Sequence, residues 1–290
     1  MVKISLSAVI EELRPLQWSK NVLALVGVVL AHKWSDPAAI RAALTAAAAL
    51  CLASSMVYVM NDIVDVDRDR VHDRHRLRPF ASGRLPIGVG FWLIPALLVG
   101  TLLVASQLAI GAVVLIAVYL FFATGYTMWL KRALWIDVVT LSGLYTLRVL
   151  AGVVAVSAPI SPWLIAFSCF VFMGLAVLKR YADLRFEPSR LAGRPYVESD
   201  RFLLLVVGVG CSLLSVLVLA LYANSEQVAA LYSRPWAIAL MCPIVAVWLL
   251  RLWTLADRGQ LAKDPVLYAL QDPVSYASLV ACGLVLVVAL

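Results

Sequence analysis

Long apolar stretches recur along the whole chain, and they limit what it can fold into. Of the 290 residues, 63% are hydrophobic and only 14% are charged. A soluble fold cannot hide that much apolar surface, whereas a helix that spans a bilayer needs about 20 apolar residues. The sequence predicts an all-α polytopic membrane protein with one domain over residues 1–290. Nine transmembrane helices are expected near 21–33, 38–60, 87–107, 109–130, 134–157, 161–180, 202–223, 235–254 and 273–290; the short first stretch leaves a count of eight open.

The cysteines argue against a disulfide-stabilised protein, and the N-terminal segment argues against a removable signal peptide. The five cysteines stand singly in apolar stretches, so they indicate small buried side chains rather than a disulfide framework or a CxxC metal site. A charged segment from Glu11 to Lys20 precedes the first apolar stretch, and no small-residue cleavage site follows it. We therefore expect no removable signal peptide.

The distribution of lysine and arginine predicts the orientation of the chain. With nine helices, twenty of these residues fall on one side and three on the other, Lys33, Arg41 and Arg234. Loops rich in positive charge stay cytoplasmic. We expect a multi-pass protein of the plasma (inner) membrane with a cytoplasmic N-terminus. The net charge of +7 is then concentrated on one face, where it would meet anionic lipid head groups; no nucleic-acid partner is expected.

The loop after the second stretch, MNDIVDVDRDRVHDRHRLRPFASGRLP, carries five carboxylates between Asp62 and Asp73. If the preceding helix continues into it, Asn61, Asp65 and Asp69 are spaced four apart and Asp62 lies on the same face. Asp67 falls on another face. Hard oxygen ligands grouped in this way suit Mg²⁺ together with the phosphate oxygens of a substrate. A solvated, charge-balanced loop is the alternative.

Three further groups of charged residues accompany this acidic face. Lys179 and Asp183 are four apart at the end of the sixth stretch, with Arg180 beside them, although basic residues commonly end a span. Arg14 and Lys20 stand before the first stretch. Arg148 lies inside the fifth stretch, where an uncompensated arginine is costly; it either faces a polar cavity, which we favour, or reaches a membrane edge. Together these residues predict a cytoplasm-facing polar cavity with metal-binding carboxylates on one wall and cations opposite.

Other chemistries lack their residue patterns. No glycine-rich loop opens onto a helix, so nucleotide hydrolysis of the Walker type is not indicated. No Ser-His-Asp or Cys-His grouping stands out either.

The run NDIVDVDRD resembles the NDxxDxxxD motif of the UbiA superfamily of intramembrane prenyltransferases, and the nine-span layout is similar to that fold over nearly the whole chain. Within the superfamily, the segments RPLQWSKN, RPFASGRLP, LRVLAG, SPWL and LKRYADL resemble the branch of decaprenyl-phosphate phosphoribosyltransferases. The chain departs from the aromatic prenyltransferases because their second motif, DxxxD, is here Lys179 to Asp183. A second metal ion at that place is therefore less favoured.

The resemblance implies Mg²⁺-dependent transfer of a phosphoribosyl group from phosphoribosyl pyrophosphate to a polyprenyl phosphate, with pyrophosphate as the leaving group. The family motif assigns the metal to Asn61, Asp62, Asp65 and Asp69. The roles of the cations rest on charge and placement alone. We expect catalytic roles for Asp62, Asp65, Lys20 and Lys179, and substrate contacts from Arg14, Lys20, Asn61, Arg148, Lys179, Arg180 and Asp183.

Two other functions stay open at this point. One is a UbiA-type transferase that moves a prenyl group from its diphosphate to an aromatic or other acceptor. The other is a non-enzymatic lipid or ion transporter, for which a polar site near the middle of the membrane would be usual. The sequence leaves the lipid chain length and the oligomeric state open, and a homo-oligomer is compatible with it.

Overall fold

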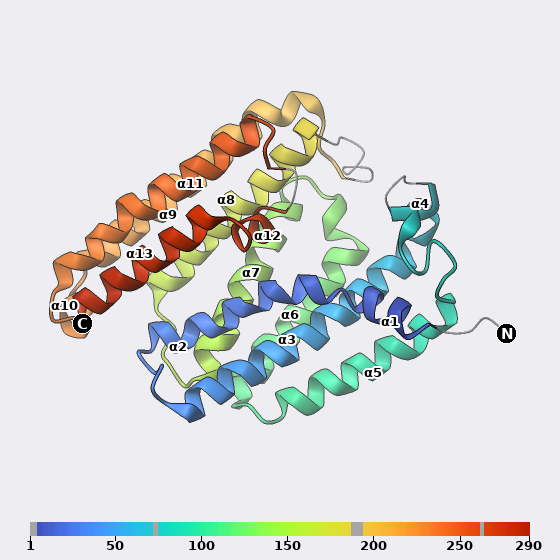
Figure 1. Cartoon of the computed structure of the whole chain (residues 1–290), viewed down its shortest axis with the longest axis horizontal. Helices are drawn as coiled ribbons and strands as arrows, with labels where there is room; N and C mark the ends of the chain where they lie inside the picture. The colour runs from blue at the N-terminus through green and yellow to red at the C-terminus, as the bar shows by residue number, and fades with distance from the viewer. Residues whose placement is uncertain (1–4, 72–74, 187–193, 262–263) are drawn as a thin grey trace. The chain divides into compact units, whose positions relative to one another are not determined.

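The computed structural model describes residues 5–71, 75–186, 194–261 and 264–290 (Figure 1). Within these ranges all regular structure is helical and no strand occurs, as the apolar pattern predicts. Asp73 of the acidic loop lies outside the described residues. The described part therefore agrees with the predicted all-α class.

Within the described ranges, seven helical segments are long and apolar enough to cross a membrane, so the chain has the build of a multi-pass membrane protein. The described helices at the predicted first and last spans are shorter, Pro15–Leu30 and Pro273–Ala289. The count of nine therefore stays a prediction. The helices that form the seven segments are α3 (Pro37–Val64), α5 (Ile87–Ala105), α6 (Ile110–Met128), α7 (Ile136–Ala155), α8 (Pro162–Phe186), α9 (Arg201–Ala223, extended by the 3₁₀ turn Glu198–Asp200) and α11 (Met241–Asp257, preceded by the 3₁₀ helix η6, Pro235–Leu240).

The chain divides into two compact units, and the boundary between them falls inside α7. The first unit comprises residues 1–131 and 147–160, and the second comprises residues 132–146 and 161–290. The single transferase domain over residues 1–290 stays a prediction.

Helix α3 is the centre of the first unit and packs against α5, α6 and η1, the 3₁₀ helix Pro15–Leu25 (Figure 1). Its alanines Ala39, Ala43, Ala46 and Ala53 are buried at helical spacing. Small residues let neighbouring helices approach closely. This stripe explains why an alanine-rich stretch forms a central helix.

A close backbone contact in the first unit joins η1 and the helix that follows it, α2 (Val26–Leu30), to the C-terminal part of α7. A Cβ atom placed on Gly152 would lie 1.9 Å from the carbonyl oxygen of Ala24, and one on Gly27 would lie 2.6 Å from the Gly152 backbone. Only glycine fits at such a contact. The segment that carries Lys20 and Asn21 is thereby held close to the part of α7 that carries Arg148.

The second unit is built on α8, α9 and α11, with α13 (Pro273–Ala289) packed along α11 (Figure 1). Gly174 and Gly208 face each other where α8 meets α9. The indole of Trp253 donates a 3.0 Å hydrogen bond to Ser212 Oγ beside them. Asp272 caps α13 and pairs with Arg251 at 2.7 Å, and the hydrogen bond from Arg251 lowers the pKa of the Asp272 carboxyl.

Candidate functional site

The acidic motif lies where α3 ends and a short helix, α4 (Val66–Val71), begins. Asp65 is the residue between them: its N–H donates to the Asn61 carbonyl at 2.9 Å, and its own carbonyl accepts from the Asp69 N–H at 2.8 Å. The helical hydrogen bonding thus continues through the motif, as the spacing predicts. The Asp62 and Asp69 side chains are buried, whereas the Asp67 side chain is 90% exposed, so Asp67 faces away from them.

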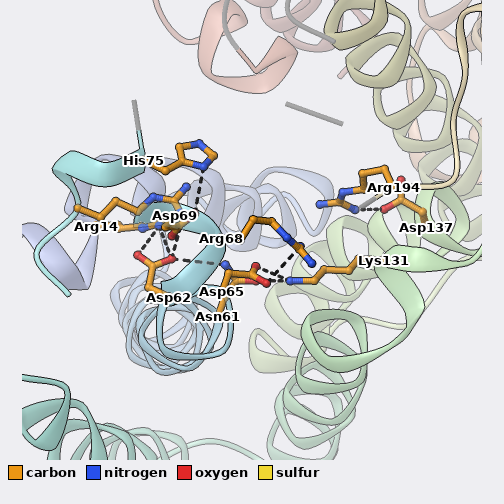
Figure 2. Close-up of polar contacts among 11 residues, drawn as sticks. Arg14, Asn61, Asp62, Asp65, Arg68, Asp69, His75, Lys131, Asp137 and Arg194 are labelled. Atoms are coloured by element: carbon orange, nitrogen blue, oxygen red, sulfur yellow. Dashed lines mark hydrogen bonds and ion pairs between the residues drawn. The ribbon is translucent and has the colours of Figure 1, made fainter. Parts of the chain in front are cut away.

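Two guanidinium groups, from Arg14 and Arg78, neutralise the buried part of this cluster. Arg14 donates to Asp62 at 2.6 Å (Figure 2). Arg78 bridges Asp62 at 3.1 Å and Asp69 at 2.6 Å, and His75 lies 3.2 Å from Asp69. Burial alone would raise the pKa of the Asp69 carboxyl, but the hydrogen bonds and charges of His75 and Arg78 outweigh it and lower that pKa.

A further cation, Lys131, contacts the other two motif residues, Asn61 and Asp65. The Lys131 ammonium lies 3.0 Å from Asn61 Oδ1 and 2.6 Å from Asp65 Oδ2 (Figure 2). Arg68 adds a longer contact to Asp65, at 3.5 Å. The Lys131 side chain is only 5% exposed. Two motif side chains therefore hold one cation between them.

The donor chemistry of the motif fits a hard divalent cation, since all its ligand atoms are carboxylate or amide oxygens. In the described ranges, no three His, Cys, Asp or Glu side chains are grouped to share a metal ion. Arginine and lysine cations occupy the carboxylates instead. The assignment of Asn61, Asp62, Asp65 and Asp69 as metal ligands stays a prediction.

Glu12 is a part of this region that the sequence did not single out. Its side chain is 1% exposed, and neither carboxylate oxygen meets a hydrogen-bond donor among the residues that the structure describes. Burial, together with the negative charge of Asp62 and a hydrogen bond to it, raises the pKa of Glu12 to about 8, against the opposing charges of Arg14 and Arg78. The sequence feature that connects Glu12 with the site is its position two residues before Arg14.

Arg148 and Lys20 are buried in the first unit. Arg148 donates to Asn21 Oδ1 and to the Tyr119 hydroxyl, both at 2.9 Å, and its guanidinium carbon lies 4.7 Å from the centre of the Tyr119 ring. Arg148 is 6% exposed and Lys20 is 8% exposed. The arginine thus lies among polar side chains of η1 and α6. The predicted cavity around it stays a prediction.

The predicted cations of the sixth stretch have different partners within the second unit. Lys179 pairs with Asp264 at 2.8 Å. Arg180 donates to Asp137 at 2.5 Å and to Asp183 at 3.2 Å. Arg194 also donates to Asp137, which is fully buried (Figure 2). The sequence does not predict that Asp137 and Arg194 contact Arg180, because they lie 43 and 14 residues from it and share no motif with it.

Replacing Arg180 with methionine is expected to destabilise the protein by about 3 kcal/mol or more, because a buried charge that loses one partner of its ion pairs is costly. Asp137 would keep only Arg194 of the two guanidinium groups described here. The matched control is Arg70→Gln, which breaks an exposed pair with Asp67 and should change stability by no more than about 0.5 kcal/mol. Thermal unfolding in detergent measures both; equal midpoints would contradict the prediction.

The fold matches that of solved structures. A UbiA homolog from Archaeoglobus fulgidus, bound to DMAPP and Mg²⁺, superimposes with a TM-score of 0.73 at 16% identity and covers 95% of this chain and 98% of that chain. At this identity the likeness concerns the fold alone.

Three curated relatives are similar in sequence. The uncharacterized protein y4nM of Sinorhizobium fredii is 35% identical over 92% of this chain, but the chain spans only 53% of that protein. Nodulation protein NoeC of Azorhizobium caulinodans is 31% identical over 98% of this chain and 94% of the relative. Decaprenyl-phosphate phosphoribosyltransferase of Mycobacterium tuberculosis is 30% identical over 92% of this chain and 89% of the relative.

The family match covers most of the helices described above. The model of the UbiA prenyltransferase family, a family of transferases, matches residues 21–279. This range includes the acidic motif, Arg148 and the Lys179–Asp183 segment, and leaves out Arg14 and Lys20. By the extent of this match, the chain belongs to the UbiA prenyltransferase family.

Proposed function

We propose that the protein transfers a phosphoribosyl group from phosphoribosyl pyrophosphate to a polyprenyl phosphate. An oxygen of the lipid phosphate forms the new bond to the anomeric carbon as the bond from that carbon to pyrophosphate breaks. An ionised lipid phosphate needs no general base. The observation that carries the proposal is the pair of motif oxygens, from Asn61 and Asp65, that already share one cation at the end of α3.

The motif residues would hold Mg²⁺ through Asn61, Asp62, Asp65 and Asp69. When bound, the metal ion neutralises charge that develops on the departing pyrophosphate. The same side chains now contact the cations Arg14, Arg78 and Lys131. In our proposal these cations would contact phosphate oxygens of the substrate beside the metal ligands.

The choice of donor rests on two supports. Lys179 stands where the aromatic prenyltransferases carry the first aspartate of their second motif, and it pairs with Asp264. The M. tuberculosis relative named a phosphoribosyltransferase is similar over nearly the whole chain. In our proposal Lys179, Arg180 and Asp183 contact substrate, and each must exchange a present partner to do so.

The lipid phosphate is assigned to the cations of the first unit. Lys20 and Arg148 are buried, and Arg148 is oriented by two neutral groups, Asn21 and Tyr119. A guanidinium fixed in this way suits a phosphate oxygen. Arg14 completes the set. We place the protein in the inner membrane with this site facing the cytoplasm, on the strength of the lysine and arginine asymmetry.

The test uses the purified full chain in detergent with Mg²⁺, phosphoribosyl pyrophosphate labelled in the ribose, and a polyprenyl phosphate. We expect label to enter the organic phase, and to stay in the aqueous phase when a chelator removes Mg²⁺. Folded protein that leaves all label in water would refute the proposal.

A second candidate is transfer of a prenyl group from its diphosphate. It is favoured by the A. fulgidus relative, whose structure holds DMAPP and Mg²⁺. A parallel reaction with labelled prenyl diphosphate and an aromatic acceptor distinguishes the two enzymes. Mg²⁺-independent movement of lipid or ions across vesicles, without transfer in either assay, would point to a transporter instead.

A further inference from the structure

Glu12 lies in the last turn of α1 (Leu6–Leu13), a helix that packs against α3 within the first unit. The backbone turns at Arg14, whose φ of 53° is left-handed. Because of this turn, the residues on either side of it both reach Asp62. Arg14 binds Asp62, and the buried Glu12 side chain also lies beside Asp62. The neighbouring Glu11 points elsewhere and pairs with Arg84 at the surface.

The burial of Glu12 needs a compensating partner. A buried carboxyl without a hydrogen-bond donor is unfavourable, and none of the described donors reaches either oxygen of Glu12. The two guanidinium groups nearby are already engaged by Asp62 and Asp69. Glu12 and Asp62 therefore place two buried carboxyl groups side by side, an arrangement that is favourable only when a proton or a cation lies between them.

We propose that Glu12 is an additional oxygen ligand, next to Asp62, for the divalent cation of this site. The inference rests on the metal dependence in the proposed function. It differs from the motif assignment in drawing a ligand from α1, outside the acidic run. Mg²⁺ binds carboxylates while retaining waters, so a second carboxylate beside Asp62 fits its preferences, and the cation gives the Glu12 oxygens the partner they lack.

Mn²⁺ is the probe, because its free and bound forms differ in their electron paramagnetic resonance signal. The full chain in detergent is titrated with Mn²⁺ in the absence of substrate. Loss of one ligand should weaken binding about 10-fold in Glu12→Gln, which keeps the shape of the side chain and can donate to Asp62. The matched control is Glu11→Gln, one residue away at an exposed ion pair, and it should bind as the unchanged protein does.

Each outcome decides between specific statements. If Asp65→Asn weakens Mn²⁺ binding and Glu12→Gln does not, Glu12 is only a protonated carboxyl hydrogen-bonded to Asp62, and the inference is wrong while the motif site stands. If the unchanged protein binds no Mn²⁺, the metal dependence of the proposed function fails as well. Should Glu12→Gln not fold, Glu12→Asp keeps the carboxylate but shortens its reach. It should also weaken binding, and unchanged affinity would overturn the inference.

Discussion

Replacing Asp65 with asparagine should lower Mg²⁺-dependent turnover by roughly 100-fold or more while the protein remains folded. Asp65 lies between α3 and α4, and its carboxylate holds the cation that it shares with Asn61. Asparagine keeps the size of the side chain and one oxygen but removes the charge. A divalent ion would lose much of its attraction at the point where pyrophosphate must be neutralised.

The measurement is the initial rate of lipid labelling at saturating Mg²⁺, with thermal unfolding as the test of the fold. Asp67→Asn is the matched control. This substitution makes the same chemical change two residues away, at a side chain that is exposed. Its turnover should stay within about 2-fold of the unchanged protein, as for a surface substitution. Full activity in Asp65→Asn would remove the motif from the mechanism.

Replacing Gly152 with alanine should destabilise the protein by about 3 kcal/mol or more, the upper range for overpacking a close contact. The added methyl carbon would lie 1.9 Å from the Ala24 carbonyl oxygen and 2.6 Å from its carbonyl carbon. These are backbone atoms, so no side-chain rotation relieves the clash. Separating η1 from α7 would also move Asn21 away from Arg148 and weaken the predicted lipid-phosphate site.

The control lies in the same helix. A Cβ atom on Gly143 would have no neighbouring atom within 4 Å, so Gly143→Ala should be neutral or stabilise the helix by up to about 1 kcal/mol. The midpoint of thermal unfolding in detergent measures both variants. Similar midpoints for the two would mean that η1 and α7 separate at little cost, contrary to the packing described here.

The local part of the site was predictable because helical periodicity links residues four apart. Asn61, Asp62, Asp65 and Asp69 follow one helical path through the α3–α4 junction, and Asp67 faces away, as their spacing predicts. The same reasoning did not predict the partners of Lys179 and Arg180. Spacing along one helix says nothing about Asp264 or Asp137, which come from other segments of the second unit.

The sequence by itself determined the class of fold and the acidic motif. Apolar stretches must form helices in a bilayer, where no water satisfies the backbone, and a run of carboxylates keeps its order along any helix. Only the tertiary structure decided which cations meet these carboxylates. Lys131 lies 66 residues from Asp65, and Arg14 lies 48 residues from Asp62. Such pairs depend on how α1, η1 and the turn after α6, Leu130–Arg132, pack around α3. The burial of Glu12 without a hydrogen-bond donor likewise exists only once that packing has formed.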